Sequence, residues 1–382
     1  MKTGLHILIN AISARLGGGI TVMRNLLPAL VQVDGQRHQY SVIVRPEIHD
    51  QIDPHNPRVR MLPQKVGENP LMRLLWEQSA LPLRSVIARA DVLFSCGGLA
   101  VAAAPIPQVL MIQNMAPFDS QVVKRAEGLK AFRLEMLRAM GIASAHVVKK
   151  VVFISEYARN AILPQMHISR DRTACVYLGK DPVFSPGARE SASVLLARYR
   201  IEEPYLFSVS QFYHYKNIVE LVLGFARACR SLSPQVKLVL AGEEIDPDYA
   251  YAVRQVIRQE HIEGRVLLIG QVPYEDLPPL YAAASLFLFP SSCENFPNIL
   301  IEALASGVPA LASRLGPMPE IAGEGAAYFD PFDPEDIARA ILAHWDQQDR
   351  CAALREAGLA RSARYSWPQC AMGLLEVLEK AP

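Results

Sequence analysis

The segment 285–313 constrains the fold of this chain more than any other part of its sequence. Residues 285–290 (Ser-Leu-Phe-Leu-Phe-Pro) form a short apolar and aromatic run, which is typical of a buried parallel strand. A helical pattern follows from about Pro297, and Gly307 stands where a helix stop is expected. Residues 308–313 have the pattern of the next strand. The segment therefore predicts a βαβ unit whose strand-to-helix loop lies at the carboxyl edge of a parallel sheet.

The loop and helix of this unit carry two carboxylates, Glu294 and Glu302, which are separated by seven residues. Ligands of α/β folds bind at the carboxyl edge of the sheet, where we expect both side chains to lie. The backbone N–H groups of the helix's first turn, about Pro297 to Leu300, would face the same crevice with the positive end of the helix dipole behind them. A phosphate fits such a helix end, and carboxylates suit hydroxyl-rich groups. The pattern therefore predicts a sugar nucleotide as the ligand, since that molecule has both parts.

A glycosidase acid–base pair is an alternative interpretation of Glu294 and Glu302. The sequence does not fix their separation, but the helix end that suits a phosphate favours hydroxyl ligands over proton transfer. Two plain surface charges are disfavoured because the surrounding residues are mostly apolar or small.

Strand and helix patterns alternate along nearly the whole chain, which predicts an α/β fold with parallel sheets covered by helices on both faces. The predicted strands are 5–10, 40–45, 91–95, 108–112, 150–154, 205–210, 236–241, 265–269, 285–290, 309–313 and 326–329. The helical patterns are 20–33, 71–89, 121–140, 191–200, 218–230, 249–259, 277–284 and 297–306.

The length of 382 residues favours two domains over one. Residues 179–187 are rich in proline and glycine, as expected of a domain linker. We predict two Rossmann-like domains facing a central cleft, one formed by residues 1–180 and the other by residues 181–364. Residues 365–382 read as a final amphipathic helix that Ser366 caps.

Composition and charge exclude several classes of protein. A net charge of +1 argues against a protein whose main partner is nucleic acid. The six cysteines are scattered and form no C-x-x-C pair, which argues against a zinc site or a disulfide framework and favours a reducing compartment. The apolar part of residues 1–10 is too short for a signal peptide, and no uninterrupted apolar stretch reaches the ~20 residues that span a bilayer. We expect a cytoplasmic protein that makes at most a peripheral contact with the inner face of the membrane.

A basic and partly apolar region is the candidate for such a membrane contact. It contains Lys124, Arg125, Lys130, Arg133 and Arg138 together with Phe132, Leu134 and Leu137. This mixture can face anionic lipid. An ordinary outer helix with a solvated face fits the same pattern and is the simpler interpretation.

Three consecutive glycines, Gly17, Gly18 and Gly19, lie between the first predicted strand and the first helix. They match neither a P-loop nor G-x-G-x-x-G. Glycines here would let the backbone approach a ligand or the opposite domain closely. A plain tight turn is an equally good interpretation.

Lys216 follows the first predicted strand of the second half. A lysine in that loop can reach the crevice beside Glu294 and neutralise a diphosphate leaving group. From this segment alone, a solvated lysine near a helix start is the simpler interpretation.

Asp246 and Asp248 have a spacing that can hold a manganese ion. They precede the helical pattern 249–259, however, where aspartates cap the helix and interact favourably with its dipole. Asp333 stands before Pro334 in the same way. We therefore predict helix caps and no metal site.

These residues together resemble glycosyltransferase family 4, a group of retaining glycosyltransferases with the GT-B fold. The resemblance covers essentially the whole chain and is strongest over residues 270–277 and 290–309. The two glutamates with their following alanine- and glycine-bearing helix are its most specific feature, and the order of the glycine loop, Lys216-Asn217, Glu294 and Glu302 also matches.

The resemblance implies a donor site in the second domain and an acceptor site in the first, with the final helix crossing back to brace the first domain. Glu294 would hold hydroxyls of the donor sugar, Glu302 the ribose hydroxyls, and Lys216 the diphosphate. The predicted donor-binding residues are Gly18, Gly19, Ser210, Gln211, Lys216, Gln271, Val272, Glu294, Asn295, Phe296, Pro297, Asn298, Ile299 and Glu302. The predicted catalytic residues are Lys216, Glu294 and Gln113.

Two positions depart from the family pattern. Gln211 stands where such enzymes often have an arginine, so one positive charge at the diphosphate is absent unless His214 or another basic residue supplies it. Gln113 stands where many members have a histidine near the donor sugar. Glutamine can donate a hydrogen bond to a sugar hydroxyl but cannot become charged.

The resemblance, together with these residues, implies a retaining, metal-independent glycosyltransferase without a cofactor. It would move a sugar from a UDP- or GDP-linked donor to a glycan or lipid-linked acceptor in bacterial polysaccharide or lipid-linked glycan assembly. The alternatives are an enzyme similar to UDP-sugar 2-epimerases, which consumes no acceptor, and a non-catalytic subunit that binds sugar nucleotides in a glycan assembly complex.

Overall fold

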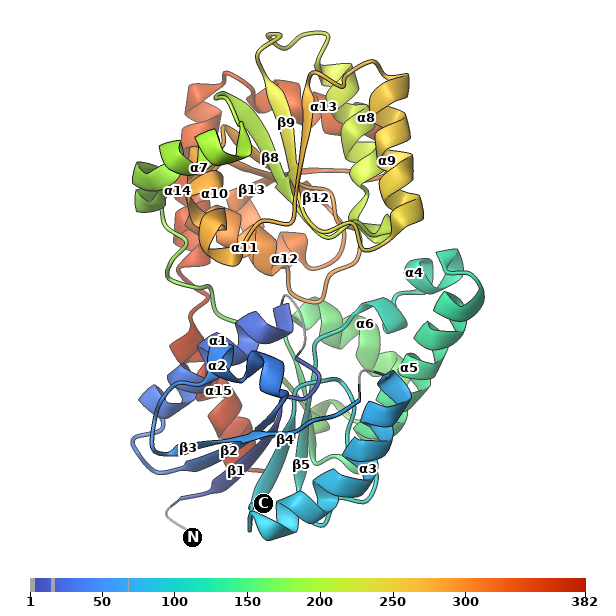
Figure 1. Ribbon diagram of the computed structural model, residues 1–382, viewed down its shortest axis with the longest axis vertical. Coiled ribbons are helices and arrows are strands. Elements are labelled where there is room, and N and C mark those ends of the chain that lie inside the picture. Colours follow the sequence, from blue (N-terminus) through green and yellow to red (C-terminus); the bar gives the residue numbers. More distant parts are fainter. Residues whose placement is uncertain (1–3, 15–17, 68) are drawn as a thin grey trace. The chain divides into compact units, whose positions relative to one another are not determined.

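The computed structural model describes residues 4–14, 18–67 and 69–382, which form two compact units (Figure 1). Unit 1 comprises the chain up to Gly179 together with Tyr365–Pro382, and unit 2 comprises Lys180–Arg364. Each unit contains one parallel β-sheet with helical connections between most of its strands. The predicted class, an α/β fold with two Rossmann-like domains, is confirmed.

Unit 1 has a seven-stranded sheet in which every described pair of strands is parallel, in the order β3-β2-β1-β4-β5-β6-β7. Its strands are His6–Asn10 (β1), Gln39–Val44 (β2), Val59–Pro63 (β3), Val92–Ser95 (β4), Gln108–Ile112 (β5), Lys150–Phe153 (β6) and Thr173–Cys175 (β7). Its helices are Gly18–Val33 (α1), His49–Ile52 (α2), Pro70–Ile87 (α3), Ser120–Arg125 (α4), Gly128–Val147 (α5), Glu156–Met166 (α6) and Trp367–Glu379 (α15).

The helices of unit 1 divide between the two faces of its sheet. The connection β1–α1–β2 runs along the strand order in one direction, whereas β3–α3–β4 and β5–α5–β6 run in the other. Because such crossovers are right-handed, α1 lies on one face and α3 and α5 lie on the opposite face. The final helix α15 packs on α1.

Unit 2 has a six-stranded parallel sheet in the order β10-β9-β8-β11-β12-β13. Its strands are Tyr205–Val209 (β8), Lys237–Ala241 (β9), Val266–Gly270 (β10), Leu286–Phe289 (β11), Ala310–Ser313 (β12) and Ala326–Phe329 (β13). Its helices are Ala192–Tyr199 (α7), Ile218–Ala228 (α8), Pro247–Gln259 (α9), Leu277–Ala283 (α10), Asn298–Ala305 (α11), Met318–Ala322 (α12), Pro334–His344 (α13) and Gln348–Ser362 (α14).

Short 3-10 helices occur in both units. They are Pro46–Ile48 (η1), Ala116–Phe118 (η2), Arg170–Arg172 (η3), Pro186–Ser191 (η4), His214–Lys216 (η5), Tyr274–Asp276 (η6) and Gly323–Gly325 (η7).

Three predicted helix caps are confirmed. Asp246 accepts a hydrogen bond from the Tyr249 N–H at 3.4 Å at the start of α9. Asp333 accepts from Glu335 N–H at 2.9 Å before α13, and Ser366 accepts from the third residue of α15 at 3.3 Å. The aspartate at 246 therefore acts as a cap, as its position before a helical pattern predicts.

The single helix predicted over 121–140 is wrong, because the chain breaks into α4 and α5. Asp119 caps α4 by accepting from the N–H groups of Gln121 and Val122. The residue after α4 is extended, and Gly128 adopts a left-handed φ of +54° that favours glycine. Gly128, which lies inside the predicted helical pattern, therefore marks the boundary between two helices.

The sequence patterns also missed two strands, β3 and β7, which are the outermost strands of the unit 1 sheet. Each pairs with a single neighbour and is only partly buried, so neither shows a continuous apolar run. Helices α6 and α14 were missed as well.

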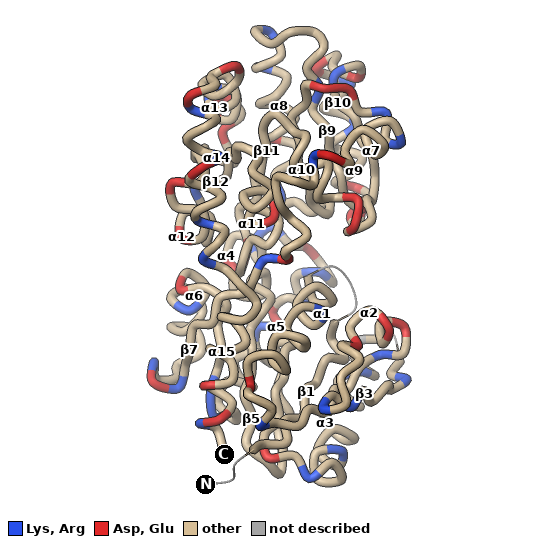
Figure 2. Tube along the Cα trace, turned by 90° about the vertical axis from the view of Figure 1, so that its left-hand side faces the viewer, with Lys and Arg blue, Asp and Glu red and all other residues tan. Residues whose placement is uncertain are grey.

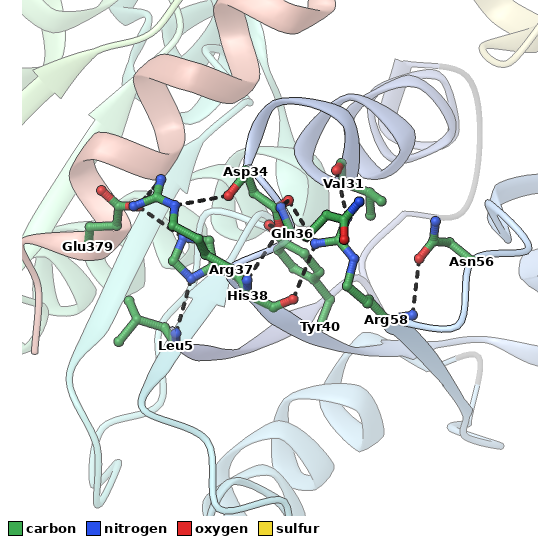
Figure 3. Close-up of polar contacts among 10 residues, drawn as sticks. All are labelled: Leu5, Val31, Asp34, Gln36, Arg37, His38, Tyr40, Asn56, Arg58 and Glu379. Atoms are coloured by element: carbon green, nitrogen blue, oxygen red, sulfur yellow. Dashed lines mark hydrogen bonds and ion pairs between the residues drawn. The ribbon is translucent and has the colours of Figure 1, made fainter. Parts of the chain in front are cut away.

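A polar network near the amino ends of β1 and β2 centres on Asp34, which is fully buried (Figure 3). Its carboxylate accepts from Tyr40 Oη at 3.0 Å and from the Arg58 guanidinium at 2.5 Å. Burial alone would raise the pKa of Asp34, but hydrogen bonds from Arg58, Gln36 and Tyr40 bring the pKa below its ordinary value. The carboxylate therefore stays charged in the folded unit.

The same network ties α15 to the sheet of unit 1 (Figure 3). The Leu5 N–H donates to Nδ1 of the buried His38 at 3.0 Å. Nε2 of His38 lies 2.9 Å from Glu379 Oε1, which also pairs with Arg37 at 2.9 Å. Because Nδ1 accepts a hydrogen bond, Nε2 is the ring nitrogen that donates to Glu379 in the last turn of α15.

Charged residues of both signs are dispersed along the trace and lie mainly on helices and loops (Figure 2). None of the helices in the described part of the chain combines the length and apolar character that a bilayer-spanning segment requires.

Candidate functional site

The sheet of unit 2 reverses its strand order between β8 and β11. The chain leaves β8 toward β9 on one side, whereas β11 lies on the other side of β8. The loops that follow β8 and β11 therefore diverge at the carboxyl edge, and such switch points are where open α/β sheets bind ligands. The loop after β8 spans residues 210–217 and the loop after β11 spans residues 290–297.

The two switch-point loops are tied to each other by hydrogen bonds to backbone carbonyl oxygens. The carbonyl oxygen of Tyr215 accepts from the N–H of Ser292 at 2.8 Å and from its hydroxyl at 3.1 Å. The side-chain amide of Asn217 donates to the carbonyl of Pro290 at 2.8 Å. Asn217 is fully buried and has a left-handed φ of +50°, which asparagine tolerates better than most residues. The loops therefore form one rigid support for the side chains they carry.

This support brings together Lys216 and Glu294, which the sequence places 78 residues apart. Lys216 Nζ lies 2.5 Å from Glu294 Oε1, and the two side chains are only 11% and 15% exposed. The ammonium also lies 5.4 Å from the ring centre of Tyr215 and 5.9 Å from that of Phe289. The interpretation of Lys216 as a solvated lysine is therefore wrong, since the lysine is part of a mostly buried ion pair.

Aromatic residues surround this ion pair. The rings of Tyr213 and Tyr215 stack at 5.4 Å with an angle of 8° between their planes. Burial raises the pKa of Tyr215, and the negative charge of Glu294 raises it further. The Tyr215 phenol therefore stays neutral and cannot compete with Glu294 as the anionic partner of Lys216.

Helix α11 begins beside Glu294, but its first turn offers fewer donors than the sequence predicted. Pro297 has no N–H group, and the N–H of Asn298 donates to the carbonyl of Phe296 at 2.9 Å. The N–H of Leu300 donates to the carbonyl of Pro297 at 3.0 Å. Of the expected donors, only the N–H of Ile299 has no acceptor within the residues that the structure describes. The expectation of several free N–H groups over 297–300 is therefore wrong.

The neighbouring helix α8 has its amino end closed by a tyrosine from another helix. The hydroxyl of Tyr249, in α9, accepts from the N–H groups of Ile218 at 2.7 Å and Val219 at 3.2 Å. The ring of His214 lies on Tyr249 with 4.4 Å between centres. No local sequence pattern indicates this cap, because the donor and acceptor residues are about 30 positions apart. Helices α8 and α11 follow the two switch-point loops. Of these two, α11 keeps an N–H group in its first turn, that of Ile299, without an acceptor among the described residues.

Glu302 lies inside α11 and is mostly buried, at 6% exposure. Its Oε1 accepts from the hydroxyl of Tyr274 at 3.2 Å, a residue that follows β10. Burial raises the pKa of Tyr281 well above its ordinary value, and the nearby Glu302 carboxylate adds to that shift. The second glutamate therefore faces tyrosine hydroxyls, which are hydrogen-bond donors like those of a sugar.

The remaining predicted residues of unit 2 lie on the same edge of the sheet. Gln271 is exposed and Val272 half-buried, directly after β10, and the segment continues to the Tyr274 that contacts Glu302. Ser210 is buried and Gln211 half-buried, directly after β8. Asn295, Phe296 and Pro297 are buried, whereas Asn298 and Ile299 are half-buried.

Gly242 fixes the path of the Ser210 segment. Its φ is +148°, and a Cβ at this position would lie 1.7 Å from the Ser210 carbonyl oxygen. Only glycine fits such a close approach, so the turn after β9 sets the course of the chain after β8.

Three predicted site residues belong to unit 1. Gly18 and Gly19 are the first residues of α1, while Gly17 lies outside the described residues. A Cβ on Gly19 would lie 3.2 Å from the Cα of Ala14, so the glycine permits a close backbone approach. Gln113 follows β5 and is half-buried, with its amide nitrogen 3.4 Å from the sulfur of Met111.

The carboxyl edge of unit 1 also holds a buried polar cluster that the sequence did not indicate. Asn10 ends β1, and its amide donates to Glu77 Oε1 at 3.0 Å. Glu77 is 5% exposed, and its Oε2 lies 3.6 Å from Arg73 Nε on the same helix. Burial raises the pKa of Glu77, while Arg73 and Asn10 partly offset this effect.

No group of three or more His, Cys, Asp or Glu side chains within residues 4–14, 18–67 and 69–382 is arranged to hold a metal ion.

Comparison with known proteins relates the chain to sugar-transferring enzymes. Residues 198–361 match the family model described as "Glycosyl transferases group 1". O-antigen chain mannosyltransferase B of Escherichia coli is 27% identical over 223 residues, which cover 58% of each protein. The chain thus spans less than two thirds of the length of this curated relative.

Solved structures resemble the chain over nearly its whole length. The sucrose-phosphate synthase of Thermosynechococcus elongatus gives a TM-score of 0.77 with 20% sequence identity and covers 98% of both chains. HepE of Anabaena, solved in complex with UDP-glucose, gives a TM-score of 0.77 with 18% identity over 98% of this chain and 99% of that one. At these identities the likeness shows a shared fold.

Proposed function

We propose that this chain transfers a sugar from a nucleotide diphosphate sugar to an acceptor hydroxyl, and the match of residues 198–361 to the group 1 glycosyl transferases supports this proposal. The observation that carries the proposal is the ion pair of Lys216 and Glu294 beside the start of α11, at the switch point of the matched domain. A cation, a carboxylate and a helix start in one place suit a ligand that combines a diphosphate with hydroxyl groups.

The donor lies with its diphosphate near Lys216 and the Ile299 N–H. The hydroxyls of its sugar donate to Glu294, and the ribose hydroxyls donate to Glu302 in exchange for the Tyr274 contact. The base lies toward Gln271 and Val272. UDP and GDP are both candidates for the nucleotide, and HepE of Anabaena is a structural neighbour whose complex contains UDP-glucose.

Binding of the donor separates Lys216 from Glu294, because the donor brings a new partner for each. The diphosphate pairs with the ammonium, and the sugar hydroxyls pair with the carboxylate. A free nucleoside diphosphate supplies only the first partner and leaves a mostly buried carboxylate without a counter-ion, which is unfavourable. The pair therefore selects a complete donor over the nucleoside diphosphate that transfer releases.

Transfer proceeds with retention of anomeric configuration and without a metal ion. The bond between the sugar C1 and the phosphate oxygen breaks, and the acceptor oxygen bonds to C1 on the same face. The acceptor's proton passes to the departing phosphate oxygen. Lys216 and the dipole of α11 stabilise the negative charge that develops on this oxygen. Gln211 supplies no charge at the diphosphate, so Lys216 carries most of this stabilisation.

The acceptor is a glycan or a lipid-linked saccharide, and the product belongs to polysaccharide or lipid-linked glycan assembly. The E. coli relative is named for the O-antigen chain, which is such a polymer. We expect the enzyme to reach a lipid-linked acceptor from the cytoplasm through a peripheral contact with the membrane.

Incubation with UDP- and GDP-linked sugars and a lipid-linked acceptor pool tests this proposal. We expect one donor class to be consumed with release of nucleoside diphosphate and formation of a glycosylated acceptor. Unchanged turnover in Lys216→Ala and Glu294→Ala variants would contradict the assignment of these residues. Conversion of the donor without an acceptor would contradict transfer itself.

A further inference from the structure

Large hydrophobic side chains are exposed mainly on two helices of unit 1. Ten of the sixteen that the structure shows as exposed lie on α3 and α5. The most exposed are Leu83 and Ile87 on α3, at 62% and 68%, and Leu129 and Phe132 on α5, at 85% and 67%. A cluster of exposed hydrophobic side chains marks an interaction surface, whereas single exposed apolar residues need no explanation.

On α3 the exposed apolar residues form a continuous stripe. Met72, Leu75, Leu83 and Val86 follow one another at steps of three or four, with the small Ser79 completing the series. These steps place side chains on one face of a helix. The opposite face packs on the sheet through Leu81 and neighbouring residues. Helix α3 is therefore apolar on both its buried and its exposed faces.

On α5 a second stripe has the same spacing. Leu129, Phe132, Met136 and Val147 are exposed, and Ala139 and Ala143 fill the positions between them. The residues at 129, 132, 136, 139, 143 and 147 again follow steps of three or four. Both stripes thus run along nearly the full length of their helices.

The two helices lie on the same face of the unit 1 sheet, as the direction of their crossovers requires. The loop between β4 and β5 joins them. Gln78 of α3 donates to the Ala100 carbonyl at 2.9 Å, and the Ala100 N–H donates to Ser144 of α5 at 3.0 Å. Figure 1 shows α3 and α5 along one flank of the unit. We call the two stripes together the α3–α5 surface.

The segments that carry this surface are strongly basic. Residues 120–149 contain six Lys or Arg and two Asp or Glu. Residues 70–89 contain three Lys or Arg and one Asp or Glu. Their joint net charge of +6 contrasts with +1 for the whole chain, so the rest of the protein is acidic. Arg133 follows Leu129 by four residues and is exposed, which places a positive charge at the border of the α5 stripe.

We propose that the α3–α5 surface binds an anionic phospholipid bilayer, with its apolar side chains in the headgroup region and its basic side chains on lipid phosphates. Apolar stripes bordered by Lys and Arg suit an anionic membrane surface. A second copy of the chain fits less well, since a two-fold interface would bring two basic segments together. This inference assigns residues to the proposed membrane contact. It rests on the proposed function only for the purpose of that contact, which is to bring the enzyme to a lipid-linked acceptor.

Vesicle sedimentation with the full chain, without nucleotide sugar, tests this surface. The probes are vesicles of phosphatidylcholine alone and of phosphatidylcholine with phosphatidylglycerol. We expect binding to the anionic vesicles that weakens as salt concentration rises. Replacing Lys130 and Arg133 by Gln should lower the partition coefficient about fivefold for each charge removed.

The apolar part of the surface is tested by Leu75→Glu with Leu83→Glu on α3, and by Leu129→Glu with Phe132→Glu on α5. Each pair should lower binding more than tenfold while the thermal unfolding midpoint stays close to that of the wild type, because these side chains are exposed. The matched control is Val194→Glu with Tyr251→Glu in unit 2, where two side chains of similar exposure, 68% and 62%, should change only the general charge.

Three results would overturn the proposal. They are an absence of wild-type binding to anionic vesicles, equal loss in the control and in the stripe variants, and a dimer in sedimentation velocity that the stripe substitutions dissociate. The last result would assign the surface to a second copy of the chain. Binding of nucleotide sugars, measured separately, reports on the proposed transfer reaction and is expected to be unchanged in every stripe variant.

Discussion

The two units differ in how the carboxyl edge of each sheet holds a buried ion pair. In unit 2, Lys216 and Glu294 come from two loops that follow two different strands. In unit 1, Arg73 and Glu77 come from one helix at a spacing of four residues, and Asn10 fixes the carboxylate. A ligand can replace each partner of the first pair, because each side chain stands on its own loop. The second pair lies within α3 and connects two residues of one helix, so we propose ligand binding at the unit 2 pair and a structural role for the unit 1 pair.

The largest expected effect is the loss of activity when the unit 2 pair loses its cation. Lys216→Met removes the cation that stabilises the departing phosphate, and kcat/KM for transfer should fall by about 10²–10³. Lys237→Met is the matched control, since this lysine starts β9 at the amino edge of the sheet and pairs with Glu202. A comparable loss in both variants would remove the distinction between the switch point and the rest of unit 2.

Substitution of Asn217 tests the link between the two loops that carry Lys216 and Glu294. Asn217→Ala loses the hydrogen bond to the Pro290 carbonyl and keeps a strained positive φ, so the free energy of unfolding should fall by about 2 kcal/mol. Asn217→Gly relieves the strain but still lacks the amide, and should recover only part of the loss. Chemical denaturation of both variants measures the two contributions. Full recovery in the glycine variant would show that the loop–loop hydrogen bond contributes nothing.

Glu294→Gln tests whether the unit 2 pair selects a complete donor. The neutral amide releases Lys216, so a nucleoside diphosphate alone should bind about tenfold more tightly than it binds the wild type. Binding of the nucleotide sugar should weaken, because the amide is a poorer acceptor for the sugar hydroxyls than the carboxylate. Titration calorimetry with both ligands checks the two opposite changes. Parallel changes for both ligands would contradict selection by the pair.

The smallest expected effect concerns pH and unit 1. The pKa of Glu77 is raised in the folded protein, so the folded state holds its proton more tightly than the unfolded state. As pH rises from the ordinary glutamate pKa through the raised value, this group therefore destabilises the fold. Glu77→Gln should remove that loss and become more stable relative to the wild type above this window, with little difference below it. Thermal unfolding of both proteins across pH 4–8 measures the difference, and the opposite trend would contradict the assignment.

Particular residues show how far sequence patterns could predict the molecule. The alternation of buried strands with helices was sufficient for two parallel sheets, because fully buried strands such as β11 and β12 are short apolar runs. Edge strand β3 and the break at Gly128 were missed because partial burial and a positive φ leave weak signals.

The site was predictable only where its chemistry lies in one segment. Glu294, Glu302 and their helix are close in sequence, so their shared loop could be identified. Tyr249 closes the start of α8 from a different helix, and no local pattern encodes that contact. The exposed stripe of α3 was not predicted for another reason. Helix α3 has apolar residues on both its buried and its exposed face, and periodicity cannot show which apolar face meets the solvent.

The most direct test of the central claim is a thermal-shift titration of the wild type and Lys216→Met with UDP- and GDP-linked sugars. A bound ligand raises stability by an amount that grows with its affinity. We expect one nucleotide class to raise the unfolding midpoint of the wild type in a saturable manner, and the same ligand to raise that of Lys216→Met far less. Equal shifts in the two proteins, or no shift with any nucleotide sugar, would contradict a donor site at Lys216 and Glu294.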